Sequence, residues 1–294
     1  MEKKGFSLVK GLRTNTENHA HTFSVGEIDG NTNWHDALKD CESVIHLAAR
    51  AHFLRDKQSK KSTDLRTVNT EGTINLARQS VKLGVRRFIF ISSIGVNGAE
   101  SFQKPFTEMD IPSPHSPYAV SKYEAELGLL KLAKQTNIEI VIIRPPLVYG
   151  PGAPGIFSSL IRWLDLGIPL PLGATNNCRS LVALKNLVDL IITCLNHPAA
   201  TNQTFMVSDD EDISTTELLF RTSKALGKPA YLLPVPKLLL QIGAKLLGKQ
   251  EIITRLFGNL QVDISHTKQI LGWTPPINVD DGLKKTAEWY LSQR

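Results

Sequence analysis

Short apolar runs alternate with longer amphipathic ones along the first half of the chain, and this alternation limits the possible fold more than any other feature. Runs that are apolar at nearly every position suit strands buried on both faces of a parallel sheet. We expect strands at 6–12, 42–49, 86–93, 138–146 and 204–209, separated by helices that include 65–83 and 117–136. The pattern predicts an α/β fold with a doubly wound parallel sheet.

The composition of the sequence changes after residue 150. Stretches rich in Gly and Pro, GPGAPG and IPLPLGATNN, come next, and helical stretches then dominate. We expect a main sheet domain over residues 1–150, whose sheet also takes in the strand at 204–209, and a smaller lobe over 151–294. A chain of 294 residues is long enough for both.

The overall charge is mildly basic, with a formal net charge of +6 and a pI of 9.2. This excess fits an anionic small molecule such as a nucleotide. Lys and Arg are spread along the chain rather than gathered in blocks, which argues against a nucleic-acid partner. A basic protein whose charge has no particular role is the alternative interpretation.

The three cysteines, Cys41, Cys178 and Cys194, are far apart and form no C-x-x-C pair. This spacing argues against a disulfide framework and a metal site, and it suits a reducing cytoplasm. The sequence predicts neither a signal peptide nor a membrane span. The apolar segment 232–248 is expected to be a helix packed on its own protein, with a helix at a membrane surface as the alternative.

A tyrosine and a lysine four residues apart, Tyr118 and Lys122, lie in the stretch SPHSPYAVSKYEAE. Alone the pair indicates little, because residues at i and i+4 share one face of any helix. Pro117 favours a helix start, which places Tyr118 in the first turn. Ser93 ends the strand at 86–93, and parallel strands present ligands at their carboxyl ends. We therefore expect Ser93 and Tyr118 to lie close together.

These residue types suit proton transfer coupled to hydride transfer. A free tyrosine has a pKa of about 10 and is a poor base at neutral pH, whereas a nearby cation lowers that pKa. With Lys122 as the cation, Tyr118 can exchange a proton with a substrate hydroxyl while hydride moves to or from a nicotinamide. Ser93 can donate a hydrogen bond to the reacting oxygen.

Several motifs together resemble the extended short-chain dehydrogenase/reductases, the NAD-dependent epimerase/dehydratase family that acts on nucleotide sugars. They are HLAA (46–49), VNTEGTINL (68–76), FIFISSIGVNG (88–98), PYAVSKYEAE (117–126), RPPLVYGPG (144–152), RSLVALKNLVDLI (179–191) and LGWTPP (271–276). The resemblance implies a Rossmann-like, dinucleotide-binding domain at 1–150 and a mainly substrate-binding lobe at 151–294.

The resemblance also implies roles for individual residues. The catalytic residues would be Ser93, Tyr118 and Lys122. Contacts to NAD, with NADP as the alternative, would come from Arg13, Glu27, Ile28, Leu47, Ala48, Ala49, Asn69, Tyr118, Lys122 and Pro145; contacts to a UDP-sugar would come from Ser93, Val148 and Arg179. A surface salt bridge is the alternative for Arg179. No metal is expected, and the resemblance is compatible with a homodimer.

Two departures from the family narrow the activity. Ser93, Ile94 and Gly95 stand where dehydratases carry Thr-Asp-Glu, so the acid and base for water elimination are missing. Leu147 replaces an asparagine that binds the substrate diphosphate, which puts UDP-glucose itself in doubt. We expect an epimerase acting at C4 of a UDP-hexose or UDP-N-acetylhexosamine. A UDP-4-keto-6-deoxy-sugar reductase and a non-catalytic nucleotide-binding protein or inactive fragment are the alternatives.

The family's first strand and its Gly-x-x-Gly-x-x-Gly turn, which cradles the cofactor pyrophosphate, have no counterpart near the start of this sequence. The run from Gly150 to Gly155 fits G-x-G-x-x-G, but Pro151 and Pro154 lack the N–H groups that a phosphate cradle needs. We interpret this run as a substrate-side loop. We expect either that the gene begins upstream or that the chain binds the cofactor poorly.

Overall fold

The computed structural model describes residues 5–13, 21–51, 65–153, 155–246 and 256–294. Contacts divide the chain into two units. Unit 1 comprises Met1–Gly98, Asp110–Arg144 and Ile191–Phe205, and unit 2 comprises Ala99–Met109, Pro145–Leu190 and Met206–Arg294. The sequence predicted a division at residue 150, with the strand at 204–209 joining the sheet of the first domain; the segments of the two units in the structure interleave along the chain.

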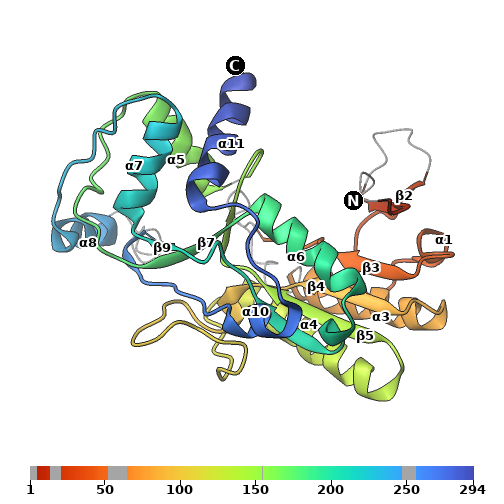
Figure 1. Cartoon of the computed structure of the whole chain (residues 1–294). Coiled ribbons are helices and arrows are strands. Elements are labelled where there is room, and N and C mark those ends of the chain that lie inside the picture. The colour runs from red at the N-terminus through yellow and green to blue at the C-terminus, as the bar shows by residue number, and fades with distance from the viewer. Residues whose placement is uncertain (1–4, 14–20, 52–64, 154, 247–255) are drawn as a thin grey trace. The chain divides into compact units, whose positions relative to one another are not determined.

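Unit 1 is built on a four-stranded sheet of β3 (Ser43–His46), β4 (Arg87–Ile91), β5 (Glu139–Arg144) and β8 (Gln203–Met206), hydrogen-bonded in that order (Figure 1). β4 pairs in parallel with both β3 and β5. β4 and β5 are buried along nearly their whole length, as expected for apolar runs in a parallel sheet. The predicted α/β fold with a parallel sheet is confirmed, although each strand is shorter than the run that predicted it.

The helices of unit 1 are α1 (His35–Leu38), the π-helical turn η2 (Thr67–Gly72), α3 (Thr73–Lys82), the 3₁₀ helix η3 (Ile94–Val96), α4 (Pro117–Gln135), the end of α6 (Leu184–Asn196) and the 3₁₀ helix η4 (Pro198–Ala200). Phe88 and Phe90 of β4 share a buried core with Leu76 of α3 and Leu129 of α4. The helices predicted at 65–83 and 117–136 are confirmed, with η2 interrupting the first of them.

Two short strands near the start of the chain, β1 (Lys10–Leu12) and β2 (Thr22–Ser24), pair in parallel with each other and form a separate two-stranded sheet. The sequence predicted a longer strand at 6–12 and did not predict β2. A Cβ on Gly11 would lie 3.1 Å from the ring of Trp34, so the backbone of β1 packs directly on this buried indole.

Unit 2 contains a three-stranded sheet in the order β6 (Leu147–Tyr149), β7 (Arg179–Ala183) and β9 (Asp212–Ile213). β6 and β7 are parallel, whereas β7 and β9 are antiparallel. Its helices are α5 (Ile156–Asp165), the start of α6, α7 (Thr215–Ala225), α8 (Lys237–Leu246), α10 (Ser265–Leu271) and α11 (Val279–Ser292). Within the described ranges, no helix is long and apolar enough to cross a membrane.

A second hydrophobic core holds unit 2 together. Tyr149 of β6 is fully buried at its centre, and its hydroxyl donates a 2.7 Å hydrogen bond to Asp209 Oδ2. Gly282 of α11 allows the helix to touch this ring, since a Cβ there would lie 2.4 Å from the Tyr149 hydroxyl oxygen.

The cysteines Cys41, Cys178 and Cys194 are all free thiols.

Candidate active site

Ser93 lies just beyond the carboxyl end of β4. It caps η3, and its Oγ accepts a hydrogen bond from the Gly95 N–H at 3.1 Å. The side chain is half-buried. A hydroxyl therefore stands at the sheet edge where parallel strands bind ligands, at the position the sequence predicted.

Tyr118 lies in the first turn of α4. Ser116 caps this helix by accepting a hydrogen bond from the Ala119 N–H at 3.2 Å, and Pro117 occupies the first helical position. A Cβ on Gly95 would lie 3.3 Å from Ser93 Oγ and 3.4 Å from Ala119 Cβ. The serine and the residue after Tyr118 thus flank the same glycine, which brings the first turn of α4 next to Ser93.

Lys122 is almost completely buried, with 1% of its surface exposed. Its Nζ donates a 2.7 Å hydrogen bond to the Ile91 carbonyl oxygen at the end of β4 and lies 4.4 Å from the centroid of the Phe90 ring. Burial lowers the pKa of Lys122 to about 7, and the nearby Glu126 carboxylate partly opposes this change. The charge of Lys122 therefore responds to pH close to neutrality.

The expected effect of Lys122 on Tyr118 differs from what the structure shows. We expected the lysine to lower the tyrosine pKa, but burial raises the pKa of Tyr118. The physical reason is that the protein partly shields Tyr118 from water, while the Lys122 ammonium group is directed toward the Ile91 carbonyl and the Phe90 ring. Spacing along a helix could not reveal this competition.

His46, the last residue of β3, lies in the same buried region. Its Nε2 is 2.9 Å from Thr73 Oγ1, and its ring stacks on Phe90 with centroids 5.9 Å apart. Burial, and secondarily Lys122, lower the pKa of His46 to about 3. The imidazole is therefore neutral at physiological pH and adds no charge beside the lysine.

A buried ion pair between β5 and α4 holds the helix on the sheet near the candidate site. Arg144 at the end of β5 contacts Glu126 through Nη2–Oε2 at 2.6 Å, and its Nη1 donates to Asn97 Oδ1 at 3.0 Å. Ser92 donates to the same carboxylate at 2.5 Å. Since Glu126 lies one turn beyond Lys122, the ion pair fixes the part of α4 that carries the lysine.

The loop after β3 carries Leu47, Ala48 and Ala49, all of which are exposed at the carboxyl end of the strand. The buried side chain of Asn69 anchors the end of this loop. Its Oδ1 accepts from the Arg50 N–H at 2.8 Å, and its Nδ2 donates to the Arg50 carbonyl oxygen at 3.0 Å. The sequence assigned Asn69 to cofactor contact, whereas these bonds favour a positioning role.

Asn69 also reaches the helix that carries the tyrosine. Its Nδ2 lies 3.0 Å from Ser121 Oγ, and that hydroxyl donates to the Tyr118 carbonyl oxygen at 2.8 Å. The sequence did not single out Ser121. Two side chains thus connect the predicted cofactor loop to the backbone of Tyr118.

Arg13 and Glu27, both predicted to contact the cofactor, form an exposed ion pair with each other. Ile28 is half-buried and packs on Gly72, where a Cβ would come within 2.6 Å of it. Close packing on η2 therefore fixes the backbone next to the ion pair.

In unit 2, Arg179 of β7 is half-buried and its Nη1 donates to the Gly258 carbonyl oxygen at 2.9 Å. Burial lowers its pKa, and Glu100 acts in the opposite direction. Arg179 and Leu147 line a pocket of about 140 Å³ whose other walls are largely apolar: Leu160, Leu181, Ile213, Ser214, Thr215, Leu218 and Leu256. Val148 of β6 is half-buried and Pro145 is buried.

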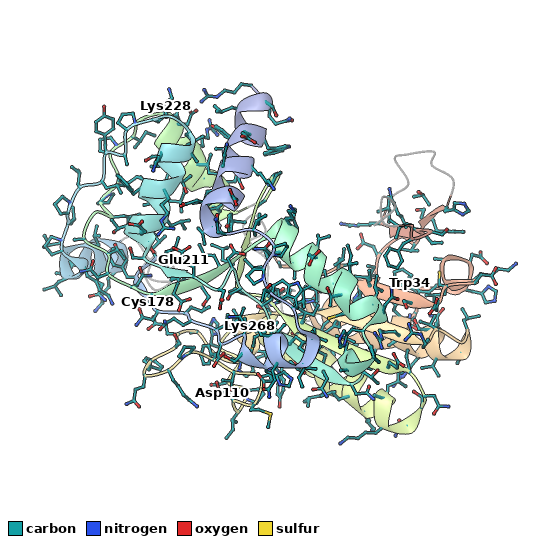
Figure 2. The ribbon with its side chains drawn as sticks, viewed as in Figure 1. Trp34, Asp110, Cys178, Glu211, Lys228 and Lys268 are labelled. Atoms are coloured by element: carbon teal, nitrogen blue, oxygen red, sulfur yellow. The ribbon has the colours of Figure 1, made fainter. Side chains whose placement is uncertain are left out.

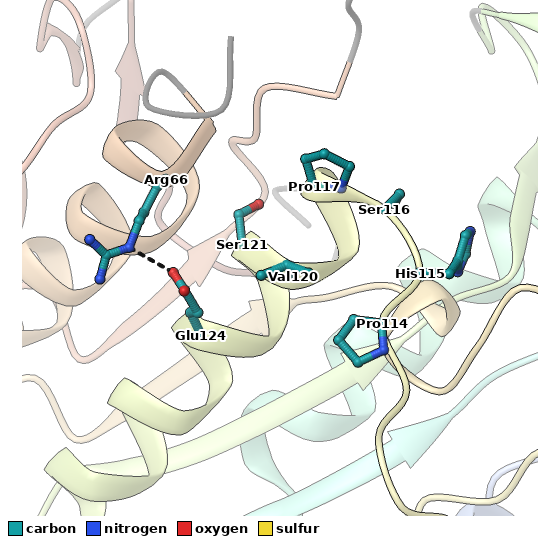
Figure 3. Close-up of a pocket in the computed structure, with 8 residues that line it drawn as sticks. All are labelled: Arg66, Pro114, His115, Ser116, Pro117, Val120, Ser121 and Glu124. Atoms are coloured by element: carbon teal, nitrogen blue, oxygen red, sulfur yellow. Dashed lines mark hydrogen bonds and ion pairs between the residues drawn. The ribbon is translucent and has the colours of Figure 1, made fainter. Parts of the chain in front are cut away.

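A larger pocket of about 380 Å³ lies beside the start of α4 in unit 1 (Figure 3). Its walls include Ser121, together with Arg66 and Glu124, which form a 2.9 Å ion pair. The remaining walls are Pro114, His115, Ser116, Pro117 and Val120. Ser93, Tyr118 and Lys122 do not line it, so we do not place the predicted chemistry there.

Known proteins resemble this chain over most of its length. A UDP-glucose 4-epimerase from Vibrio cholerae is 51% identical over 271 residues, which cover 92% of this chain and 83% of the relative. An N-acetyl-α-D-glucosaminyl-diphospho-ditrans,octacis-undecaprenol 4-epimerase from Escherichia coli O157:H7 is 27% identical over 90% of this chain and 82% of its own length.

A solved structure shares the fold. A UDP-glucose 4-epimerase from Thermotoga maritima, determined with UDP-glucose, superposes with a TM-score of 0.75 at 21% identity, covering 99% of this chain and 93% of that one. The model of the NAD dependent epimerase/dehydratase family matches residues 4–208. The resemblance inferred from the motifs is confirmed, and the chain belongs to the NAD-dependent epimerase/dehydratase family.

Proposed function

We propose that this protein is an NAD-dependent enzyme that inverts C4 of a UDP-hexose or UDP-N-acetylhexosamine. The observation that carries the proposal is the approach of Ser93 and the first turn of α4 across Gly95, with Lys122 buried one turn further along. The 51% identity to a UDP-glucose 4-epimerase supports the same reaction. The activity predicted from the sequence agrees with this relative.

The residues present fit a dinucleotide cofactor. The exposed stretch Leu47–Ala49 follows a parallel strand at its carboxyl end, where such ligands bind, and Asn69 fixes the backbone that follows it. The exposed carboxylate of Glu27, beside Arg13, suits a ribose hydroxyl better than a second phosphate. We therefore favour NAD over NADP. When bound, NAD takes up hydride from the sugar carbon and returns it.

The side chains of unit 1 would handle the proton and the developing charge. Tyr118 would remove the proton of the 4-hydroxyl as hydride leaves C4, and would return a proton to the same oxygen when hydride comes back to the opposite face of C4. Ser93 would donate a hydrogen bond to the same oxygen. Lys122 would hold the ribose hydroxyls of the cofactor, as the family resemblance implies, and its hydrogen bond to the Ile91 carbonyl fixes the position of the side chain.

Arg179 would bind the substrate diphosphate in unit 2. The pocket beside it is mainly apolar, and Leu147 forms part of its wall. A diphosphate attached to a polyprenyl chain fits these walls as a second candidate substrate class. The relative named for an undecaprenyl-diphosphate sugar supports that candidate.

The direct test supplies UDP-N-acetylglucosamine and UDP-glucose with NAD and without reduced cofactor. The expected result is a 4-epimer of at least one sugar, detected by NMR. Turnover only of a 4-keto-6-deoxy sugar with consumption of reduced cofactor would identify the reductase instead. Absence of turnover in both assays and with a polyprenyl-diphosphate-linked N-acetylglucosamine, together with nucleotide binding, would identify a non-catalytic protein.

Two variants test the assigned roles. Tyr118→Phe should lose kcat by at least about a hundredfold, because the proton donor and acceptor is removed. Ser93→Ala should reduce kcat by about ten- to a hundredfold through loss of one hydrogen bond. Both variants should melt like the wild type in circular dichroism. Full activity of the phenylalanine variant would exclude the mechanism.

We further propose a cytoplasmic homodimer. The free thiols of Cys41, Cys178 and Cys194 suit a reducing compartment. Val120 and Leu127, seven residues apart on α4, expose apolar side chains that a second copy could cover. Light scattering after size exclusion should give twice the chain mass, and Leu127→Glu should give the monomer mass.

A further inference from the structure

Helix α8 of unit 2 exposes the face that an ordinary surface helix would bury. Leu238, Leu239 and Ile242 are 67%, 59% and 51% exposed, whereas Leu240 packs against the core of the unit. At 100° per residue the three exposed side chains fall within about 100° of the helix circumference. Lys245, also exposed, falls beside this stripe. The apolar stripe therefore points away from the core of unit 2.

The segment before α8 is held rigidly and continues the exposed apolar surface. Tyr231 and Leu233 are 54% and 50% exposed. Backbone hydrogen bonds join them to Leu170, from the Leu170 N–H to the Tyr231 carbonyl at 2.9 Å and from the Leu233 N–H to the Leu170 carbonyl at 2.8 Å. Their outward orientation is thus fixed by the backbone of the unit. We call the five side chains Tyr231, Leu233, Leu238, Leu239 and Ile242 the α8 face.

Charge indicates what the α8 face contacts. Between residues 218 and 250 the chain has six Lys or Arg and no Asp or Glu. Of these, Lys224, Lys228, Lys237 and Lys245 are exposed, and Figure 2 shows Lys228 in the turn after α7. Cations beside an exposed apolar stripe are typical of a helix that lies in the surface of an anionic bilayer.

Another exposed apolar stretch of the chain has the opposite charge. Phe102, Met109 and Ile111 are 84%, 83% and 89% exposed. Residues 99–113 contain three acids and one lysine, so anionic lipid would repel this stretch. Exposed apolar side chains alone therefore do not indicate lipid, and the α8 face differs from residues 99–113 in its basic surrounding sequence.

We propose that the α8 face docks the protein on the surface of an anionic lipid bilayer. The apolar side chains enter the boundary between headgroups and acyl chains, and Lys237 and Lys245 remain at the level of the lipid phosphates. Binding of this kind is reversible and depends on salt, because exposed charges are screened. The proposal concerns where the protein works and holds for either substrate class.

Sedimentation of the full chain with vesicles tests the proposal. Vesicles of phosphatidylglycerol and phosphatidylcholine in equal parts are compared with vesicles of phosphatidylcholine alone. The wild type should bind the anionic vesicles, and about 0.5 M salt should weaken this binding. The variant L238Q/L239Q/I242Q should bind at least about tenfold more weakly, and K237E/K245E should lose the preference for anionic lipid.

A matched control removes three exposed apolar side chains elsewhere. F102Q/M109Q/I111Q should bind vesicles like the wild type. Circular dichroism melting and turnover of a water-soluble substrate should show that all variants are folded. Failure of the wild type to bind anionic vesicles would overturn the proposal, as would equal losses in the control and the α8 variant. If the wild type does not bind vesicles and L238Q/L239Q/I242Q converts a dimer to a monomer, the α8 face forms an interface between two copies of the chain instead.

Discussion

The Nζ atom of Lys122 donates a hydrogen bond to the Ile91 carbonyl oxygen across 2.7 Å, joining α4 to the end of β4. The bond satisfies a charged group that is otherwise enclosed by the protein. Its acceptor, Ile91, lies two residues before Ser93 along the chain. Stability and proposed chemistry therefore depend on the same side chain.

Lys122 should make the free energy of unfolding depend on pH above neutrality. Its pKa is lowered to about 7 in the folded state, so the unfolded state binds more protons between that value and the ordinary lysine pKa of 10.5. Stability should rise with pH across this window, by at most about 1.4 kcal/mol per pH unit from this group. Lys122→Met should lack that contribution in urea titrations from pH 6 to pH 10.

The control for this prediction is Lys131→Met, which removes an exposed lysine from the same helix. It should keep the wild-type pH dependence. If the free energy of unfolding of Lys122→Met depends on pH as steeply as that of the wild type, the buried lysine keeps its proton throughout this range.

Asn69→Ala should weaken cofactor binding more than it slows turnover. The substitution leaves the N–H and carbonyl of Arg50 without the amide that holds them, and it frees Ser121 Oγ from the same partner. We expect a loss of stability of about 1–3 kcal/mol and a several-fold higher Kd for NADH, measured by calorimetry.

Asn186→Ala is a matched control for the asparagine prediction. Asn186 is also buried, and it holds the N–H and carbonyl of Ile277 in unit 2 in the same two-bonded way. This variant should lose comparable stability and leave the Kd for NADH unchanged. Equal weakening of NADH binding in both variants would assign the effect to general loosening of the protein.

Gly95→Ala should lower activity with little loss of stability. The added methyl group would stand 3.3 Å from Ser93 Oγ and 3.4 Å from Ala119 Cβ, so one of them must move by a few tenths of an ångström. We expect kcat to fall about tenfold and the free energy of unfolding to change by less than about 1.5 kcal/mol. Gly30→Ala, whose nearest neighbour would be 3.7 Å away, should leave kcat unchanged.

Arg87→Met should be strongly destabilising. The guanidinium is 1% exposed and donates hydrogen bonds to Glu139 and to the carbonyls of Cys194 and His197. Removing it leaves the carbonyls of Cys194 and His197 and the half-buried Glu139 without this donor and should cost about 3–5 kcal/mol in chemical denaturation. Arg86→Met is the control, because Arg86 is substantially exposed and should cost less. Similar losses of stability in the two variants would show that the burial of Arg87 does not determine the cost.

The sequence predicted the elements of unit 1 whose apolar pattern is strong. The runs at 86–93 and 138–146 contain β4 and β5, and the helix predicted at 117–136 is α4. Pro117 and the strand end at Ser93 were sufficient to predict that the first turn of α4 lies near the serine. Such features depend on local spacing and on the geometry of parallel strands, which the sequence contains directly.

Other features depend on contacts between distant parts of the chain. The strand β2 has three residues and no distinctive pattern, so it was not predicted. The interaction of Asn69 with Ser121 joins residues 52 positions apart, and only the packing of η2 on α4 creates it. The direction of the Tyr118 pKa was wrong because burial depends on the tertiary structure.

The contacts of Asn69 have a consequence for how the protein would respond to its ligand. A single amide group touches the loop at Arg50 and the hydroxyl of Ser121, which in turn touches the tyrosine's main chain. A molecule that settles on the loop thereby restrains the helix turn bearing Tyr118 as well. Under the proposed function, binding of the nucleotide and alignment of Tyr118 would then be one ordering event.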